Sequence, residues 1–229
     1  MSTLSNRTDV YLEAGQKRVF ACAVDWPGWA RGGRDESGAL QALLDYAPRY
    51  ARILDNARID FAAPTDVAAF TVVERLTGNA TTDFGAPDMA PASDAREIDE
   101  AELQRLTALL KAYWQALDAA VQAADGKELR KGPRGGGRNV EGIVRHVMGA
   151  DHNYLARLAW KIKAEKGAGL NAELAEMRQA VLDALAAAVR DGLPERGPRG
   201  GAIWLPRYFV RRAAWHVLDH TWEIEDRTP

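Results

Sequence analysis

Two histidines stand four residues apart near the end of the chain, at His216 and His220. On a helix this spacing places both imidazoles on one face about one turn apart, where they can bind the same metal ion. Glu223 follows on that face and could act as a carboxylate beside a ligand, as a further ligand or as a proton carrier. A solvated residue at a helix end is the alternative for Glu223, and packed core histidines without a metal are the alternative for the pair.

A third histidine, His146, lies in the segment NVEGIVRHVMGADHNYLARL. Gly142, Gly149 and Ala150 lie about one turn away from it, and a glycine costs a helix about 1 kcal/mol relative to alanine. These small residues indicate that a close helix contact, or a metal with a bound substrate, needs space beside His146. Three imidazoles with one open coordination position are typical of a catalytic metal site. His152, six residues further on, is predicted to be a surface residue or a neighbour of the site.

Four long helices are predicted to position these histidines. Capping signals and apolar periodicity place them at about 97–125, 139–163, 172–191 and 207–225. Connections of loop length between them favour an antiparallel four-helix bundle over residues 97–229. In such a bundle the second and fourth helices, which carry all the histidines, run in the same direction.

The motif GPRGG occurs twice, at Gly132–Gly136 and at Gly197–Gly201, each time upstream of a histidine-bearing helix. In an antiparallel bundle both copies would lie at one end. Arg134, Arg138 and Arg199, together with two helix N-termini, would then form a rim that favours an anionic group. Two solvent-exposed turns that are similar by chance are the alternative.

The first part of the chain reads differently. Residues 1–78 alternate short strand-like segments with two helices, of which the first is capped by Asp35 and the second restarts at Pro48. Residues 79–96 are polar and rich in proline and small residues, so a linker is predicted there. The predicted fold class is therefore an α+β module followed by an all-α bundle.

Bulk composition excludes some classes of protein. The chain has 229 residues, a net charge of −2 and one cysteine, Cys22. The near-neutral charge argues against a nucleic-acid or membrane-surface protein, and no apolar run reaches the length of a membrane helix. One cysteine allows no internal disulfide, and no signal-peptide pattern opens the chain, so we expect a cytoplasmic protein. A small-molecule substrate is expected, and a homodimer is left open.

The segment around His146, followed about 50 residues later by RRAAWHVLDHTWEIEDR, resembles the DinB/YfiT-like superfamily of metalloenzymes. The resemblance covers about 97–227. It implies a four-helix bundle in which His146, His216 and His220 bind a divalent metal, commonly zinc or nickel. Several DinB-like proteins are implicated in reactions that use low-molecular-weight thiols, so such a thiol is a candidate cofactor.

The segment RVFACAVDWPGWARGGRDESGALQALLDYAPRY resembles the small HicB-like fold. HicB proteins are antitoxins that pair with an RNA-cleaving partner and often carry a DNA-binding tail. This chain shows no such tail, and residues 1–95 carry 9 Lys and Arg against 13 Asp and Glu. The resemblance therefore implies a reused module for dimerisation or partner binding.

Two functions follow from these observations. The first is a metal-dependent transferase or hydrolase, in which three histidines activate a water or a thiol and Arg134, Arg138 and Arg199 receive a small anionic substrate. The second is a metal-stabilised stress or interaction protein without catalysis. Metal analysis would distinguish both functions from the third alternative, in which the histidines are packed core residues without a metal.

Overall fold

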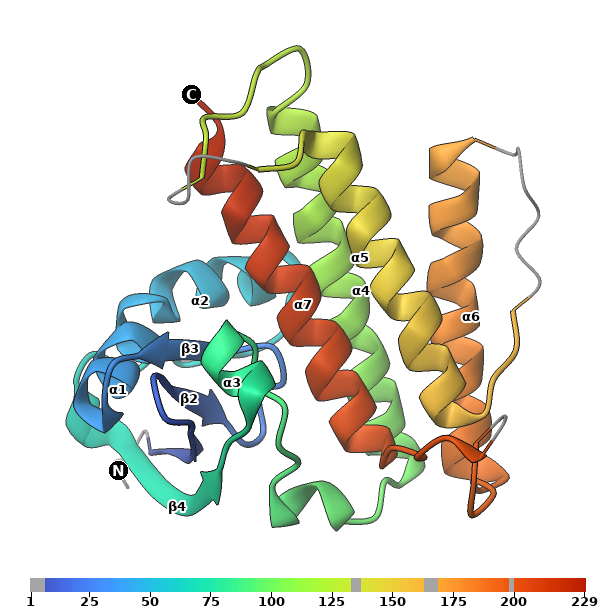
Figure 1. Ribbon diagram of the computed structural model, residues 1–229, viewed down its shortest axis with the longest axis horizontal. Helices are drawn as coiled ribbons and strands as arrows, with labels where there is room; N and C mark the ends of the chain where they lie inside the picture. The colour runs from blue at the N-terminus through green and yellow to red at the C-terminus, as the bar shows by residue number, and fades with distance from the viewer. Residues whose placement is uncertain (1–6, 133–136, 163–168, 198–199) are drawn as a thin grey trace. The chain divides into compact units, whose positions relative to one another are not determined.

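The computed structural model describes residues 7–132, 137–162, 169–197 and 200–229. The chain divides into two compact units, Met1–Arg96 and Glu97–Pro229. Figure 1 shows a small sheet with helices in the first unit and long helices in the second. No helix in these ranges is both long and apolar enough to cross a membrane.

The first unit is built on a four-stranded mixed sheet of order β3-β2-β1-β4. Its strands are β1 (Thr8–Ala14), β2 (Val19–Ala23), β3 (Ala30–Gly33) and β4 (Phe70–Thr77). Sequential strands β1, β2 and β3 pair antiparallel, whereas β4 returns to pair parallel with β1. Parallel pairing needs a long crossover, and α1 (Glu36–Asp45) and α2 (Ala47–Asn56) lie in it. The predicted α+β class of this part is confirmed.

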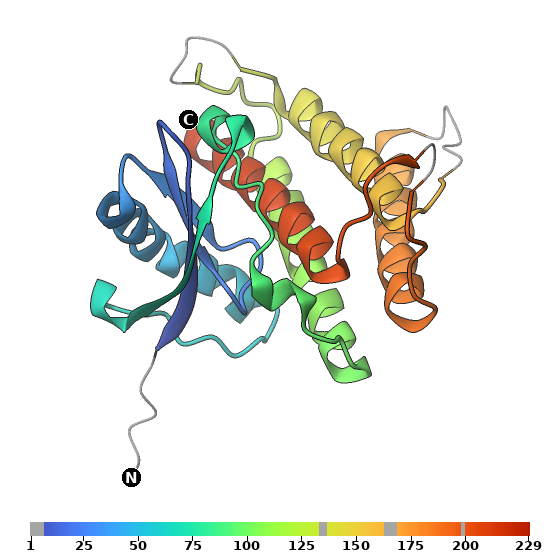
Figure 2. The ribbon, with the colours of Figure 1, turned by 60° about the horizontal axis from the view of Figure 1, so that its bottom comes forward.

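An aromatic cluster forms the core between the sheet and its helices. Trp29 stacks on Tyr50 of α2 with ring centroids 5.5 Å apart, and Phe61 meets both rings edge-on. The Trp29 indole N–H donates to the carbonyl of Leu43 in α1 at 3.0 Å. Figure 2 shows α1 beside the sheet. The two predicted helix starts are also present, because Asp35 caps α1 at Gly38 N–H and a proline opens α2.

Residues 79–96, predicted to be a linker, fold back on the first unit instead. Asn79 caps the short helix α3 (Ala80–Phe84) in a capping box with Thr82. Glu13 of β1 is completely buried and accepts hydrogen bonds from the Thr82 hydroxyl and from the N–H groups of Asp88 and Met89. Composition alone suggested a linker; the buried carboxylate on β1 binds the segment to the sheet.

The second unit contains four long helices in the described residues: α4 (Glu100–Ala123), α5 (Val140–Leu155), α6 (Leu170–Arg190) and α7 (Pro206–Arg227). Asp99 caps α4 at Glu102 N–H, as its sequence predicts. The second helix ends earlier than expected. It passes into a short 3-10 turn, Ala156–Leu158, and Ala159 takes a left-handed conformation with φ of 56°.

The direction of the helices differs from the antiparallel prediction. Arg207 at the start of α7 pairs with Glu102 at the start of α4. After the end of α4, Arg130 N–H donates to the carbonyl of Arg227 at the end of α7, at 2.8 Å. Helices α4 and α7 therefore run in the same direction, as Figure 1 shows.

Helices α5 and α6 are also parallel to each other and run opposite to α4 and α7. Arg145 near the start of α5 pairs with Glu173 near the start of α6, and Arg190 at the end of α6 pairs with Glu100 at the start of α4. The eleven residues between Leu158 and Leu170 can span at most about 36 Å, so this chain length is compatible with two parallel helices.

Candidate metal centre

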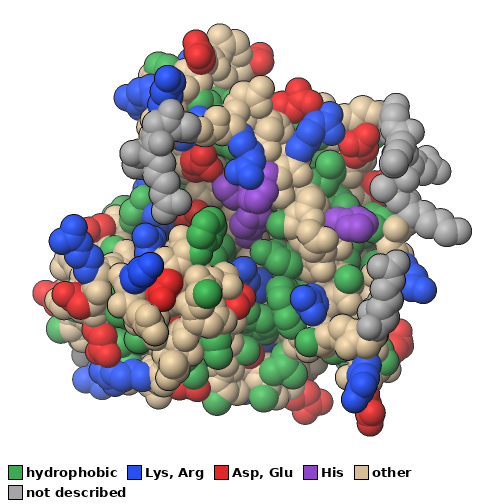
Figure 3. Space-filling model, in the orientation of Figure 1, with side chains coloured by type: hydrophobic (Ala, Val, Ile, Leu, Met, Phe, Trp, Pro, Cys, Tyr) green, Lys and Arg blue, Asp and Glu red, His purple; other side chains and the backbone are tan. Residues whose placement is uncertain are grey.

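Three histidine side chains from α5 and α7 meet in the second unit. Each of His146, His216 and His220 offers a ring nitrogen, and the three nitrogens lie within 4.8 Å of one another. The Nε2 atoms of His146 and His216 are 3.3 Å apart. The ring centroids are separated by 4.7 to 5.0 Å. Figure 3 shows histidine side chains gathered at one place on the surface, with basic side chains next to them.

Because α5 and α7 are antiparallel, the ring of His146 on α5 lies beside the two rings on α7. His146 lies six residues after the start of α5 at Val140, and His220 lies seven residues before the end of α7 at Arg227. In antiparallel helices these positions fall side by side. The four-residue spacing then places His216 one turn further along the same face.

Glu223 contacts His220 and is not one of the three residues whose possible ligand atoms lie together. Its Oε2 lies 2.7 Å from His220 Nδ1, so the Nε2 of that ring is left for the cluster. Its Oε1 accepts from Arg227 Nη1 at 2.5 Å. The hydrogen bond with His220 is the main cause of the lowered pKa of Glu223, which is therefore ionised. A carboxylate in this position fixes the tautomer and the orientation of an imidazole that binds metal.

The environment of His146 and His216 favours their neutral imidazoles. Burial lowers the pKa of His216 to about 2, and the positive charges of Arg212 and Arg138 act in the same direction. The pKa of His146 is also lowered, chiefly by burial. Neutral imidazole is the form that binds a metal ion.

The donor set fits a divalent ion. Two nitrogens bound to one tetrahedral zinc ion lie about 3.3 Å apart, which is the separation of the His146 and His216 Nε2 atoms. The residues present could therefore hold a metal.

The predicted anion rim stays a prediction, because parts of both GPRGG motifs fall outside the described residues. The end of α7 contacts the segment after the first GPRGG motif, because Arg227 donates to the carbonyl of Arg138 at 2.9 Å. The segment after the second motif lies at the other end of α5, where Trp204 N–H donates to the carbonyl of Arg157. The described segments that follow the two motifs thus lie at opposite ends of α5, because α5 and α7 are antiparallel.

The predicted site residues are brought together only in part. Arg138 lies near the histidines, since its charge acts on both His146 and His216. Arg134 and Arg199 fall outside the described residues. His152 is exposed and does not belong to the three-histidine group.

Arg227 is the residue that the sequence analysis missed. It is buried, and its guanidinium joins Glu223 to the backbone carbonyls of Arg130 and Arg138. The signal was present, because Glu223 and Arg227 stand four residues apart, which is the spacing of an ion pair on one helix face.

Comparison with known proteins gives one match. The family model of the DinB superfamily matches residues 109–224, which is just over half of the chain and includes all three clustered histidines. No curated protein matches the chain, and no solved structure does.

Proposed function

The chain belongs to the DinB superfamily, and from that premise we propose that His146, His216 and His220 bind one divalent metal ion in an enzyme active site. The observation that carries the proposal is the cluster itself, in which three ring nitrogens from two helices lie within 4.8 Å of one another. An all-imidazole donor set suits zinc or nickel.

Three neutral imidazoles leave the full charge of the ion uncompensated and leave at least one coordination position open. A metal held in this way supplies Lewis acidity that activates a water or a thiol near neutral pH. We propose a transferase or hydrolase of small molecules, with a low-molecular-weight thiol as candidate co-substrate. The family resemblance and the lowered pKa values of His146 and His216 support this class.

The role proposed for Glu223 is to position His220. Both of its carboxylate oxygens are occupied, one by His220 and one by Arg227. A carboxylate fixed on both sides orients the imidazole, whereas a proton carrier would need an oxygen facing the substrate. Arg138 stays the proposed contact for an anionic group, because it is a charged residue near two of the histidines.

For the first unit we propose partner binding or self-association, on the basis of its resemblance to HicB-like modules. A mixed sheet with two helices in its crossover is compatible with such a module. Sedimentation of the full chain at several concentrations tests self-association, because a reversible dimer would shift its sedimentation coefficient with concentration.

Metal content tests the site. The protein is purified without a nickel column and examined by elemental analysis beside His216→Ala and His152→Ala. We expect about one metal ion per chain in the wild type and in His152→Ala, and almost none in His216→Ala. Wild-type protein that is folded but carries no metal, or His216→Ala protein that retains it, would contradict the proposed site.

Catalysis is tested next with metal-loaded protein, screened against low-molecular-weight thiols and electrophilic small molecules. Activity that disappears in His216→Ala supports an enzyme. Full metal content without turnover of any thiol-dependent or hydrolysable substrate would instead favour a metal-stabilised interaction protein.

A further inference from the structure

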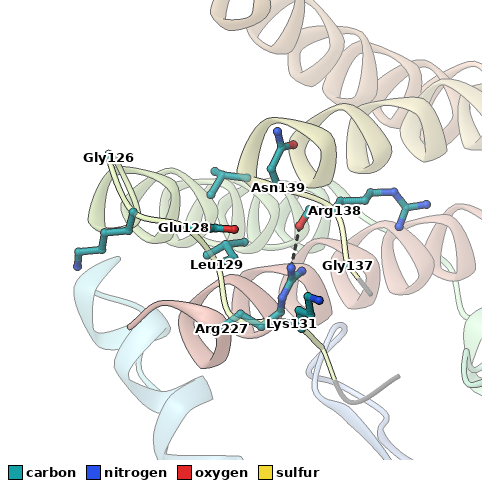
Figure 4. A pocket seen from close by; sticks show the side chains of 10 residues that line it. Gly126, Glu128, Leu129, Lys131, Gly137, Arg138, Asn139 and Arg227 are labelled. Carbon is teal, nitrogen blue, oxygen red and sulfur yellow. Dashed lines mark hydrogen bonds between the residues drawn. The ribbon is translucent and has the colours of Figure 1, made fainter. Parts of the chain in front are cut away.

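The histidine cluster has different neighbours on its two sides along α7. Towards the end of the helix, Glu223 binds both His220 and Arg227. Arg227 in turn donates to the carbonyl of Arg138, as Figure 4 shows. Towards the start of the helix, aromatic rings lie beside His216, and Figure 3 shows hydrophobic side chains next to the gathered histidines. The polar groups on one side bind one another, whereas the rings on the other side offer apolar surface next to the proposed metal.

Three aromatic residues form a continuous row that begins at His216. The ring of Tyr154, near the end of α5, has its centroid 6.2 Å from that of His216. Trp204, just before α7, lies 5.1 Å from Tyr154, and Tyr208 in the first turn of α7 lies 4.9 Å from Trp204. These separations are those of rings in contact. Tyr154, Trp204 and Tyr208 are called the aromatic wall below.

Backbone and side-chain contacts hold the aromatic wall in place. Trp204 N–H donates to the carbonyl of Arg157 at 2.9 Å, which fixes the segment before α7 to the end of α5. The Arg157 guanidinium lies 5.7 Å from the Trp204 ring centroid, and that of Arg212 lies 5.8 Å from the Tyr154 ring centroid. Arg212 Nη2 also donates to the Tyr154 hydroxyl at 3.5 Å. Rings that are fixed before a ligand arrives lower the entropy cost of binding it.

Two rings of the aromatic wall keep part of their area at the surface. Tyr208 is buried, but Tyr154 and Trp204 are only half-buried. The tryptophans of α7 itself, Trp215 and Trp222, are buried and belong to the core. Packing of the core therefore accounts for the α7 tryptophans, whereas Tyr154 and Trp204 leave apolar area that a ligand can cover.

The charges around the aromatic wall favour some aromatic ligands over others. The guanidinium groups of Arg157 and Arg212 lie over its two half-buried rings, and the charge of Arg212 acts on His216 as well. Two positive charges beside a proposed metal ion repel a cationic ligand. An uncharged or anionic ring meets no such repulsion.

We propose that the aromatic wall binds the ring of an uncharged or anionic aromatic substrate, whose polar end reaches the metal held by the three histidines. The inference rests on the proposed function only for the metal-bound end of that substrate. Ring binding by Tyr154 and Trp204 is a separate property and can be measured with a probe that does not chelate metal.

The first test is saturation-transfer NMR of the full chain as purified, with benzamide and with acetamide, which share an amide group and differ in the ring. Trp204→Ala removes one wall ring. Trp160→Ala is the control, because Trp160 is also half-buried but contacts no ring of the wall among the described residues. We expect saturation of the benzamide ring by wild type and Trp160→Ala, and binding about fivefold weaker in Trp204→Ala. Trp204→Phe, which keeps a ring, should restore most of it.

The second test uses zinc-loaded protein and two chelating probes, benzohydroxamate and acetohydroxamate, in calorimetric titrations. Wild type should bind the ring-bearing probe about tenfold more tightly. Trp204→Ala should lose this preference while its affinity for acetohydroxamate is unchanged, because the metal and its ligands are intact. Tyr154→Leu removes the ring nearest the histidines and replaces Trp204→Ala if that variant does not fold.

The outcomes separate the two proposals. The inference is overturned if wild type does not saturate benzamide, or if Trp204→Ala and Trp160→Ala bind it alike. Zinc-dependent binding of both hydroxamates without any preference for the ring would also contradict the inference, and would leave the proposed metal site standing. Benzamide binding that depends on Trp204, in a protein that binds neither hydroxamate, would instead contradict the open metal position of the proposed function alone.

Discussion

The two units bury a carboxyl group in opposite ways. Glu13 of the first unit is completely buried and accepts hydrogen bonds from a hydroxyl and two backbone N–H groups. Asp151 on α5 of the second unit is also buried, yet its Oδ1 has no hydrogen-bond partner in the described ranges. Burial raises the pKa of both groups, but hydrogen bonds oppose it at Glu13, whereas only the charge of Arg178 opposes it at Asp151.

This difference indicates what each carboxyl group contributes. A fully satisfied buried group holds its neighbours in one arrangement, as Glu13 holds residues 79–89 against the sheet. An unsatisfied buried group costs stability, and such costs concentrate where a fold serves a function. In the second unit, Asp151 Oδ1 and His216 Nδ1 are buried without a hydrogen-bond partner among the described residues. They lie on α5 and α7, the two helices that also carry the proposed metal ligands.

Replacing Glu13 should have the largest effect on stability. Glu13→Ala leaves the Thr82 hydroxyl and two backbone N–H groups without their acceptor and opens a cavity. We expect a loss of about 5 kcal/mol in the unfolding free energy of the first unit. Hydrogen exchange of β1 and β2 amides reports this unit separately.

Glu74→Ala is the matched control, because Glu74 also accepts a backbone hydrogen bond, from Ala92, but in an exposed position. Its loss should be below about 1 kcal/mol. If the two substitutions lowered the unfolding free energy equally, burial of Glu13 would not be the cause of its large contribution to stability.

Replacing Asp151 should stabilise the second unit, and the gain should depend on pH. Burial raises the pKa of Asp151 from 3.8 to about 7. Below pH 3.8 the carboxyl is protonated in both states and contributes nothing. Between pH 3.8 and about 7 the unfolded chain loses this proton first, so stability falls as pH rises. Above about pH 7 the loss is complete and reaches about 4 kcal/mol at most.

Asp151→Asn should therefore raise the unfolding free energy by about 2–4 kcal/mol at about pH 8, and by little at about pH 4. Urea unfolding is followed at both pH values in the presence of a chelator, because metal binding has its own pH dependence. Asp118→Asn is the control, since Asp118 is half-exposed and paired with Arg178. A gain at Asp151 that is the same at both pH values would exclude ionisation as its cause.

Local patterns in the sequence predicted much of the site. The four-residue spacing of His216 and His220 fixes their common face wherever the helix lies. Together with a third histidine in another helix, this pattern anticipated the cluster that the structure forms. Caps such as Asp35 and Asp99 act within one turn, so they were also predictable.

Longer-range features could not be predicted from such patterns. Helix direction depends on contacts between whole helices, such as the pairs Arg207–Glu102 and Arg145–Glu173, and composition does not reveal which helix ends will meet. The binding of residues 79–89 by Glu13 joins segments about 70 residues apart, and the sequence gives no sign that Glu13 is buried. The shared rim of the two GPRGG motifs was predicted on the assumption that the second and fourth helices run in the same direction, whereas α5 and α7 run in opposite directions.

Glu223 provides an intermediate case, a satisfied carboxylate beside the proposed metal site. Glu223→Gln removes the charge that fixes His220 and pairs with Arg227. We expect metal affinity to fall about 10- to 100-fold with little change in fold. Competition with a chelator of known affinity measures the effect. Glu141→Gln is the control, because it alters only an exposed ion pair with Arg145 on α5, and it should leave the metal affinity unchanged. Equal losses of metal affinity in the two variants would contradict a positioning role for Glu223.

Two glycines extend the comparison to the smallest expected effect. A Cβ at Gly33 in the first unit would collide with the backbone of Gly38 and Ala39, whereas a Cβ at Gly149 on α5 would meet open space. Gly149→Ala should therefore stabilise the second unit by about 1 kcal/mol through helix propensity alone, and Gly33→Ala should destabilise the first unit. Thermal unfolding measures both changes. The small residues near His146 were interpreted as space for a close helix contact or for a metal with a bound substrate, and Gly149→Ala tests this directly. Unchanged metal content and unchanged turnover would show that Gly149 has no part in the site, whereas a stabilised variant with reduced turnover would show that the substrate uses this space.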